Sequence, residues 1–430
     1  MKWALINPRW TFEGSIYFGC REPHLPLEFG YSRQLLQEQG HEVRIFDAQL
    51  FNLSEEQLRD KVERFAPDYT VVTTAPSYLF WRCAPPELRI PQALIARIRD
   101  VAGTIVVVGP HASTTPLATL RKTGADVVVL GECEEVLPQL AGDWNSVQSI
   151  AWIGKGAPRV QGVPHASRMD RLPALQWEDS FVRNHQHHHH RFDSQSSEPG
   201  AEMECSRGCP YHCTFCAKDN FRDSYRKRPP AVILQELDGL LRQGVEYIYF
   251  IDEIYLPDRY LLEQFVERSF RFGIQTRIDL WNERMLKLLG QAGCVSVEAG
   301  VESITPEGRQ SLDKNCRMST EDLTSRLIYA KRHIPFVQAN LIQMVEDDEK
   351  QVEQWREELR SHGVWANSPV PMFPYPGSPD YTRRWGPPDD RAWERAMNFY
   401  LGSFHGFSDI QEQRPLRLEE LEHPALRVLP

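Results

Sequence analysis

Three cysteines within eight residues constrain this chain more than any other feature of its sequence. Cys209, Cys213 and Cys216 are separated by three and then two residues. Three thiolates placed this way can ligate three irons of a cubane cluster from one short loop, which leaves the fourth iron without a protein ligand. That open iron is available for chemistry. The spacing therefore predicts a 4Fe-4S cluster held by these three cysteines.

The alternative reading of the same cysteines is a structural zinc site. Such a site uses four nitrogen or sulfur ligands, usually as two separated pairs, and it is closed. The sequence contains no second Cys-x2-Cys pair. Cys205 could in principle be a fourth ligand, but it lies on the strand-like approach to the loop. We therefore favour a packing role for Cys205.

The loop from Glu204 to Cys216, with Phe215 just before its last cysteine, resembles the signature of the radical S-adenosylmethionine (SAM) superfamily. In that family the open iron chelates the amino and carboxylate groups of SAM, and the reduced cluster splits a carbon–sulfur bond to give a 5′-deoxyadenosyl radical. The resemblance implies SAM as a cofactor, with Phe215 bordering the adenine. It also implies an electron donor such as flavodoxin or ferredoxin.

The net charge and the cysteine content limit which partners the protein is expected to bind and in which cellular compartment it is expected to work. The formal net charge of −10 argues against a nucleic-acid-binding face, which usually carries a basic surplus. One basic cluster, Arg222 with residues 226–228, suits a small anionic ligand or is a solvated loop. Nine cysteines, an odd number, indicate reduced thiols. Pro8 comes too early for a signal-peptide core, and no run of about 18 apolar residues occurs. We expect a cytoplasmic protein without a membrane span and with an oxygen-sensitive cluster.

Residues 1–145 alternate short apolar strands with helices, which predicts a doubly wound, Rossmann-like parallel sheet. The run 104–108 is β-branched and continuous, as in a strand buried on both faces. In such a sheet, ligands bind beyond the carboxyl ends of the strands. Three polar turns fall on that edge, at residues 73–77, 109–113 and 131–132. No Gly-x-Gly-x-x-Gly follows the first strand, so a dinucleotide is not favoured.

These three turns together resemble the cobalamin-binding domain that precedes many radical SAM barrels. The resemblance implies cobalamin as a cofactor, bound by the residues of the turns. They are Thr73, Thr74, Ser77, Gly109, Pro110, His111, Ala112, Ser113, Gly131 and Glu132. The Asp-x-His-x-x-Gly motif that supplies a histidine below cobalt is absent, so the resemblance implies no lower histidine ligand. His111 would line the corrin, or it is a capping or structural residue. The aromatic run 78–83 would cover the lower corrin face, or it is core.

Residues 146–200 are rich in Pro, Gly, Ser and charge and read as an interdomain linker. The histidine run 187–190 lacks carboxylate partners and is a weak metal site.

From residue 201 to 385, strands and helices alternate again, with strands expected at 247–251, 275–280, 294–299, 336–342 and 368–372. Six such units suit a partial (β/α)6 barrel with polar groups at the carboxyl ends of its strands. Residues 386–430 form a C-terminal helical extension, which we expect beside the barrel mouth.

Later turns of the barrel resemble those of the cobalamin-associated radical SAM branch, in family order. The resemblance places Asp252 and Glu253 at the SAM amino group, and Arg277 at the carboxylate or ribose. The turns 300–303 (Gly-Val-Glu-Ser), which contains Glu302, and 375–379 (Tyr-Pro-Gly-Ser-Pro) match further motifs of that branch. For each single polar residue, a barrel-rim charge satisfied by its neighbours is the plain alternative.

The resemblance implies a cobalamin-dependent radical SAM enzyme acting on a small molecule, with radical methyl transfer to an unactivated carbon as the leading hypothesis. A rearrangement, cyclisation or oxidation with the same cofactors is the first alternative. A redox- or cobalamin-responsive binding protein without turnover is the alternative from another class. The sequence does not identify the substrate.

Overall fold

The computed structural model describes residues 1–10, 23–76, 88–154, 156–185, 199–218, 221–222 and 224–403. Ser77, the aromatic run 78–83 and the histidine run 187–190 lie outside the described residues. The chain divides into two compact units. The first comprises Met1–His185, Ala217–Ser224 and Pro374–Gly402, and the second comprises Gln186–Cys216, Tyr225–Phe373 and Ser403–Pro430.

The first unit is built on a seven-stranded sheet in the order β2-β1-β3-β4-β5-β6-β7. The strands are β1 (Lys2–Asn7), β2 (Glu42–Asp47), β3 (Tyr69–Thr73), β4 (Thr104–Val108), β5 (Val127–Val129), β6 (Ile150–Gly154) and β7 (Ala157–Gln161). The first five are parallel, and β6 and β7 add antiparallel at the edge. The order reverses between β1 and β3, as in doubly wound sheets. The predicted Rossmann-like sheet is confirmed.

Helices cover this sheet because each buries one apolar stripe against it. The helices are α1 (Leu27–Glu38), α2 (Glu55–Phe65), α3 (Arg89–Ile98), α4 (Pro110–Thr114), α5 (Pro116–Thr123) and α6 (Asp179–Asn184). Leu58 and Val62 of α2, together with Leu94 and Ile98 of α3, join a buried core with Val107 of β4. Ser54 begins α2 with a capping box that it forms with Gln57.

The stretch 146–200, predicted as a linker, contributes strands β6 and β7 to the first sheet and also contains α6. Ile150 and Ala151 are fully buried, and β6 pairs with the short central strand β5. Strands β6 and β7 pair antiparallel, with Gly154 and Gly156 around the bend, so this part of the stretch is a hairpin rather than a free connection. The composition of the stretch is therefore that of a hairpin followed by loops.

The second unit is built on a six-stranded sheet, all parallel, in the order β15-β14-β13-β12-β11-β8. The strands are β8 (Gly200–Met203), β11 (Tyr247–Phe250), β12 (Arg271–Thr276), β13 (Cys294–Glu302), β14 (Phe336–Leu341) and β15 (Trp365–Ala366). A separate hairpin pairs β9 (Ser206–Arg207) with β10 (Arg226–Lys227). The predicted partial barrel is confirmed.

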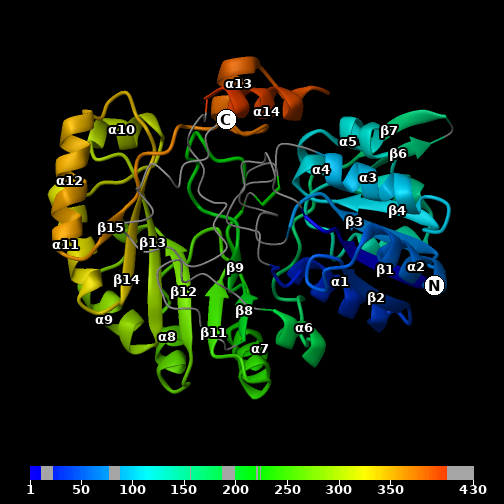
Figure 1. Ribbon diagram of the computed structural model, residues 1–430, viewed down its shortest axis with the longest axis horizontal. Helices are drawn as coiled ribbons and strands as arrows, with labels where there is room; N and C mark the ends of the chain where they lie inside the picture. The colour runs from blue at the N-terminus through cyan, green and yellow to red at the C-terminus, as the bar shows by residue number, and fades with distance from the viewer. Residues whose placement is uncertain are drawn as a thin grey trace. The chain divides into compact units, whose positions relative to one another are not determined.

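Helices lie along the outer side of this curved sheet (Figure 1). They are α7 (Pro230–Arg242), α8 (Arg259–Val266), α9 (Glu283–Gln291), α10 (Pro306–Ser311), α11 (Thr320–Lys331) and α12 (Glu349–Ser361). Side chains cap several helix starts, as Asn282 does for α9 and Asp348 for α12. The connections from each strand to the following helix gather at the carboxyl edge of the sheet.

Two barrel strands begin earlier than the sequence predicted. The strand expected at 275–280 is β12, which ends at Thr276, and residues 278–280 form a 3-10 turn. The strand expected at 368–372 is β15, which ends at Ala366. At Asn367 the side chain replaces the backbone hydrogen bonds, because its Oδ1 accepts from Leu341 N (2.7 Å) and its Nδ2 donates to Leu341 O (3.3 Å). This side-chain amide interrupts the pairing, which resumes as an isolated parallel bridge between Ile342 and Val370.

Two further helices, α13 (Pro379–Trp385) and α14 (Ala392–Ser403), belong to the first unit although they follow the barrel in sequence. Helix α14 contacts α4 and α5, and the expected place of residues 386–430 beside the barrel mouth stays a prediction. Lys122 of α5 forms an ion pair with Glu394 of α14. The Tyr381 ring of α13 is fully buried.

A buried carboxyl group closes the carboxyl ends of β1 and β2. Asp47 is fully buried, and it accepts hydrogen bonds from Asn7 Nδ2 (3.1 Å to either oxygen) and Leu50 N (2.8 Å). Trp10 Nε1 in turn donates to Asn7 Oδ1 (2.9 Å). Burial raises the pKa of Asp47 to about 6, because the charged form loses its hydration.

Replacing Asp47 by Asn should stabilise the first unit most above pH 6. In the wild type, the protonated carboxyl contributes stability below its unfolded pKa of 3.8, and this contribution is lost as the pH rises through about 6. The amide of the variant stays neutral and still accepts from Leu50 N. The difference in the free energy of unfolding between the variant and the wild type should therefore increase by about 3 kcal/mol from pH 4 to pH 7, in favour of the variant. Chemical denaturation of both proteins across this range measures the gain, and a difference that does not change with pH would contradict it.

Candidate functional site

The cysteine loop follows β8 at the carboxyl edge of the second unit's sheet. Backbone hydrogen bonds fix its shape: Cys216 N donates to Cys213 O (3.0 Å), which closes a tight turn, and Thr214 N donates to Leu312 O (2.9 Å). Cys209, Cys213 and Cys216 are all partly buried and carry free thiols. Three thiols on one short, anchored loop fit three corners of a cubane cluster. Their role as ligands stays a prediction.

Two positively charged side chains lie near the Cys213 thiol. Burial raises the pKa of the Cys213 thiol to about 11, while Lys314 and Arg277 act in the opposite direction. Thiolates are the form that binds iron, so positive charge beside a buried thiol favours the ligand form. The donor set and its electrostatic surroundings therefore agree with a metal cluster.

Arg277, predicted to meet the SAM carboxylate or ribose, leaves β12 next to the cysteine loop. Its guanidinium carbon lies 3.9 Å from the ring centroid of Tyr211, which belongs to the loop. Nη2 pairs with Asp279 Oδ2 (2.7 Å), and Nη1 donates to Lys314 O (2.5 Å). Arg277 thus packs on the cysteine loop and also fixes the segment that carries Lys314.

Glu302 ends β13 in an unusual conformation. Its φ of 64° lies in the left-handed region, and the register of β13 with β14 shifts between Gly300 and Glu302. A side chain at Gly300 would meet Glu302 Oε1 at 2.4 Å, so the Glu302 carboxylate would have to move to admit it. This bulge turns the Glu302 carboxylate toward Lys314, with which it forms an ion pair. Backbone strain of this kind gathers at functional sites.

Lys314 is the site residue that sequence reasoning missed. Its side chain is only 3% exposed, and it joins Glu302 to the surroundings of Cys213. It follows α10 in an irregular segment, after Asp313 in a left-handed conformation. Because such a segment has no periodic pattern, the available signal was only a lysine among polar residues, which is too common to single out.

Asp252 and Glu253, predicted at the SAM amino group, follow β11 and contact the backbone of the cysteine loop. Asp252 accepts from Cys205 N (3.0 Å) and forms a short hydrogen bond with Ser206 Oγ. Glu253 Oε2 accepts from Gly208 N (2.8 Å). Burial raises the pKa of Asp252 to about 7. Phe215, predicted at the adenine, is partly buried within the loop.

Cys205 is buried, and its thiol pKa is raised well above the usual value by desolvation. Its backbone N–H is held by Asp252. The Asp252 carboxylate adds to this rise, whereas nearby cations favour the thiolate of Cys213, and this difference supports a packing role for Cys205. It lines a cavity of about 120 Å³ together with Tyr225, Asp252 and Tyr255.

In the first unit, the three predicted cobalamin turns follow the adjacent strands β3, β4 and β5 and are joined by hydrogen bonds. His111 Nδ1 lies 3.0 Å from Thr74 Oγ1, and Gly131 N donates to Ser113 Oγ (2.7 Å). Thr73 Oγ1 donates to Ala75 O (2.8 Å). The predicted residues of the turns, Ser77 apart, therefore form one continuous edge.

The residues of this edge fit a corrinoid bound without a histidine below cobalt. The His111 ring is fully buried and engaged with Thr74, so it does not point out of the edge. Gly109 and Gly131 have φ of 130° and 78°, conformations in which a side chain is disfavoured. Pro110 and Ala112 lie in the first turn of α4 and add no charge. Glu132 is buried, pairs with Arg222 (3.3 Å) and accepts from Ser167 N (2.7 Å).

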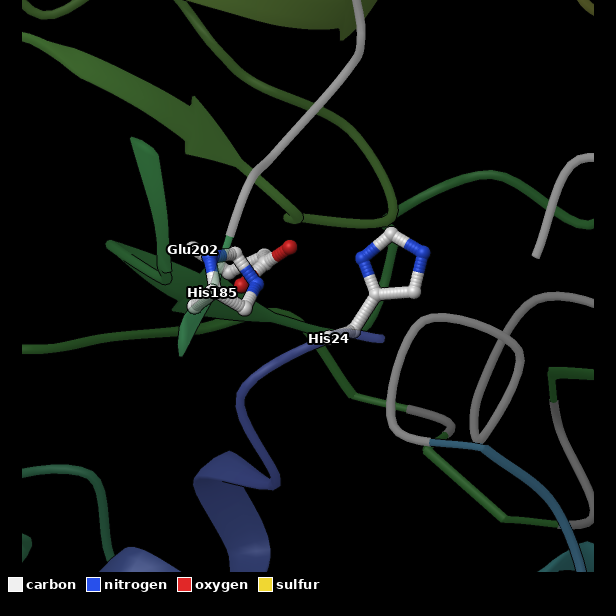
Figure 2. Close-up of side chains that lie close together, drawn as sticks. All are labelled: His24, His185 and Glu202. Carbon is white, nitrogen blue, oxygen red and sulfur yellow. The ribbon is translucent and has the colours of Figure 1, made fainter. Parts of the chain in front are cut away.

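A pair of buried histidines also belongs to the first unit. The ring centroids of His24 and His185 are 6.4 Å apart at an interplanar angle of 62°. His185 follows α6, and its charge lowers the pKa of Asp47 against the larger effect of burial. Figure 2 shows both rings. Sequence reasoning did not single out His24, since an isolated histidine gives no spacing signal.

Comparison with known families agrees with both halves of this description. A family model of the Radical SAM superfamily matches residues 203–359, and a model of the B12 binding domain matches residues 21–141. The chain carries a radical SAM domain and a B12-binding domain. The matched residues include the three cysteines in one case and the turns after β3 and β4 in the other. The family resemblance stated from the sequence is confirmed.

Curated relatives of the chain are distant. An uncharacterised methyltransferase of Pyrococcus horikoshii is 23% identical over 65% of this chain and 61% of its own length. The anaerobic magnesium-protoporphyrin IX monomethyl ester cyclase of Rubrivivax gelatinosus is 26% identical over 70% of this chain and 56% of its own length. The hopanoid C-3 methylase of Methylococcus capsulatus is 27% identical over 80% and 67%. The chain spans about three fifths of the length of the first of these relatives.

Solved structures share the fold. The radical SAM methyltransferase TsrM of Kitasatospora setae, solved with cobalamin and a [4Fe-4S] cluster, has a TM-score of 0.70 at 16% identity and covers 89% of this chain and 75% of its own. OxsB, a cobalamin-dependent radical enzyme solved with aqua-cobalamin and SAM, has a TM-score of 0.68 at 17% identity and covers 93% and 66%. Within the described residues, no helix combines the length and the apolar character needed to cross a membrane.

Replacing Cys209, Cys213 or Cys216 by Ala should abolish assembly of the cluster, because each removes one of only three protein ligands. Replacing Cys205 by Ala should leave it intact, because that thiol is buried and its pKa is raised. Visible absorbance and iron content after anaerobic reconstitution measure the outcome. Loss of the cluster in the Cys205 variant would revise the ligand set.

Replacing Lys314 by Met should weaken cluster binding, because a buried cation beside Cys213 is lost and Glu302 keeps an uncompensated charge. Groups that support metal ligands typically contribute tenfold or more to affinity, so we expect a loss of roughly tenfold. Lys314→Arg keeps the charge and serves as the control. Competition with an iron chelator measures the affinity, and equal retention of iron by all three proteins would exclude this role for Lys314.

Proposed function

We propose that this protein is a cobalamin-dependent radical SAM enzyme that transfers a methyl group to an unactivated carbon of a small molecule. The observation that carries the proposal is the anchored loop of three cysteines in a chain that also has a B12-binding domain. When bound, the cluster and SAM supply a 5′-deoxyadenosyl radical, and cobalamin supplies the methyl group. TsrM and the hopanoid C-3 methylase, both similar to this chain, are named as methyl-transferring enzymes.

The chain's own residues would hold and orient these cofactors. Cys209, Cys213 and Cys216 would ligate the cluster, while Asp252 and Glu253 hold the backbone that leads to the first of them. Radical chemistry gains from rigid placement, because a displaced radical reacts with the wrong bond or with solvent. A carboxylate that fixes the cysteine loop therefore contributes to the reaction through position.

Arg277 and Lys314 would supply positive charge where an anionic cofactor group and a cluster held by three thiolates meet. Both cations are mostly buried, and each is paired with one carboxylate, Asp279 or Glu302. A paired, buried cation keeps its position when a ligand arrives, so it costs little reorganisation. We place the SAM carboxylate or ribose beside Arg277 and the adenine beside Phe215.

In the first unit, the edge formed by the turns after β3, β4 and β5 would hold cobalamin. The contacts we assign are those of Thr73, Thr74, Gly109–Ser113, Gly131 and Glu132. An electron donor such as flavodoxin or ferredoxin would deliver the electron, and we place the protein in the cytoplasm, where its thiols stay reduced.

A second function keeps both cofactors and ends in cyclisation, rearrangement or oxidation. The similarity to the magnesium-protoporphyrin ester cyclase of Rubrivivax gelatinosus favours it specifically. The two functions differ in the fate of the methyl group and not in the residues that hold the cofactors.

Incubation with methyl-deuterated SAM, reductant and cobalamin, with cell extract as a substrate source, should give 5′-deoxyadenosine and a product that carries the deuterated methyl group. Mass spectrometry of both compounds measures the result. The Cys213→Ala variant is the matched control and should give neither. Formation of 5′-deoxyadenosine with unlabelled product would replace methyl transfer by the second function. Absence of 5′-deoxyadenosine would favour a binding protein without turnover.

A further inference from the structure

The C-terminal helix α14 is attached to the predicted cobalamin-binding edge by specific contacts. Ala392 and Ala396 are fully buried, so one face of the helix packs closely on the first unit. Arg121 forms an ion pair with Asp390, and Lys122 forms one with Glu394. A helix held by a buried face and by two ion pairs is an integral part of the unit on which it lies.

Trp393 is the centre of this attachment. Its indole is 4% exposed, and its ring centroid lies 4.1 Å from that of His111 at an interplanar angle of 39°. Its Nε1 donates to Thr115 Oγ1 (3.0 Å), and Thr115 Oγ1 donates to His111 O (3.3 Å). The indole therefore contacts the imidazole directly, and it reaches the backbone of the same residue through Thr115.

His111 is held from its other side as well. Its Nδ1 lies 3.0 Å from Thr74 Oγ1, in the turn after β3, and its ring is fully buried. The imidazole thus lies between a strand end and a helix that is about 280 residues later in the chain. Removal of the indole would leave the imidazole exposed on one face and would free the turn 109–113 to move.

We propose that Trp393 is a positioning residue for cobalamin, which acts through His111 on the turn 109–113. This inference rests on the proposed function, because it takes the edge of the first unit as the corrinoid site. It adds that α14 belongs to that site, although the family match to the B12 binding domain ends at residue 141. The aromatic stack contributes to affinity by holding the turn in its binding geometry before the ligand arrives.

The test compares hydroxocobalamin binding by the full-length wild type with that of four variants: Trp393→Ala, Trp393→Phe, His111→Ala and the double variant Trp393→Ala/His111→Ala. Trp393→Ala should raise the dissociation constant about tenfold, while Trp393→Phe, which keeps a stacking ring, should stay within about threefold of the wild type. The double variant should bind like His111→Ala, because two residues that act through one contact are not additive.

Equilibrium dialysis measures the dissociation constants, and thermal unfolding verifies the fold of each variant. Glu394→Gln is the matched control: it removes the neighbouring ion pair of α14, leaves the indole in place, and should bind like the wild type. Should Trp393→Ala fail to fold, Thr115→Val carries the test. It removes the acceptor of the indole together with the hydroxyl that donates to His111 O, and it should weaken binding in the wild-type background but not in the His111→Ala background.

Four results are decisive. Equal binding by the wild type and Trp393→Ala would overturn the inference and leave the proposed function intact, as would fully additive effects in the double variant. Equal losses in Trp393→Ala and Glu394→Gln would also overturn it, because they would show general loosening of α14. Absence of cobalamin binding by the wild type would instead overturn the corrinoid half of the proposed function.

Discussion

The structure of the second unit depends on holding three thiols on one short loop. A loop of this kind has few backbone partners of its own, because it lies beyond the end of β8 and does not continue the sheet. Its N–H groups donate hydrogen bonds to the carboxylates of Asp252 and Glu253 and to the carbonyl of Leu312. These acceptors come from the ends of other βα units, so the barrel architecture supplies what the loop lacks. A buried donor without a partner costs free energy, and the carboxylates avoid that cost while they fix the loop.

Much of this arrangement follows from the sequence, because it is expressed as spacing and alternation. Both sheets were predicted from continuous apolar runs, and the cysteine loop from its spacing. Asn367 and Glu302 show where this fails: one ends a strand with its side-chain amide, and the other forms a bulge with a positive φ. Trp393 and Lys314 were missed for another reason. Their partners, His111 and Glu302, are set by the tertiary fold, and no local pattern connects them.

Buried ion pairs hold the segments that flank the cysteine loop and restrict the positions these segments can take. Arg207 pairs with Glu204, and Arg228 pairs with Glu236, with all four side chains at most 1% exposed. Arg228 Nη1 also donates to Glu204 O (3.0 Å). Such pairs add little net stability, since desolvation offsets their attraction, but loss of one partner leaves an uncompensated charge. They therefore allow few alternative arrangements of β9 and β10, which suits a loop whose three sulfurs need one geometry.

The first unit meets a different requirement at its edge. A corrinoid is a large ligand whose rim carries mostly amide groups, and an uncompensated charge in its site would have to be desolvated on binding. The acidic residue of this edge, Glu132, is neutralised inside the protein by Arg222 and accepts from Ser167 N. His111 is likewise engaged by Thr74 and stacked against Trp393. The edge consequently offers backbone groups, small side chains and hydroxyls, while its ionisable groups serve to hold the turns together. Affinity for such a ligand then depends on the shape of the turns more than on any single polar contact, which is why residues behind the turns matter as much as those within them.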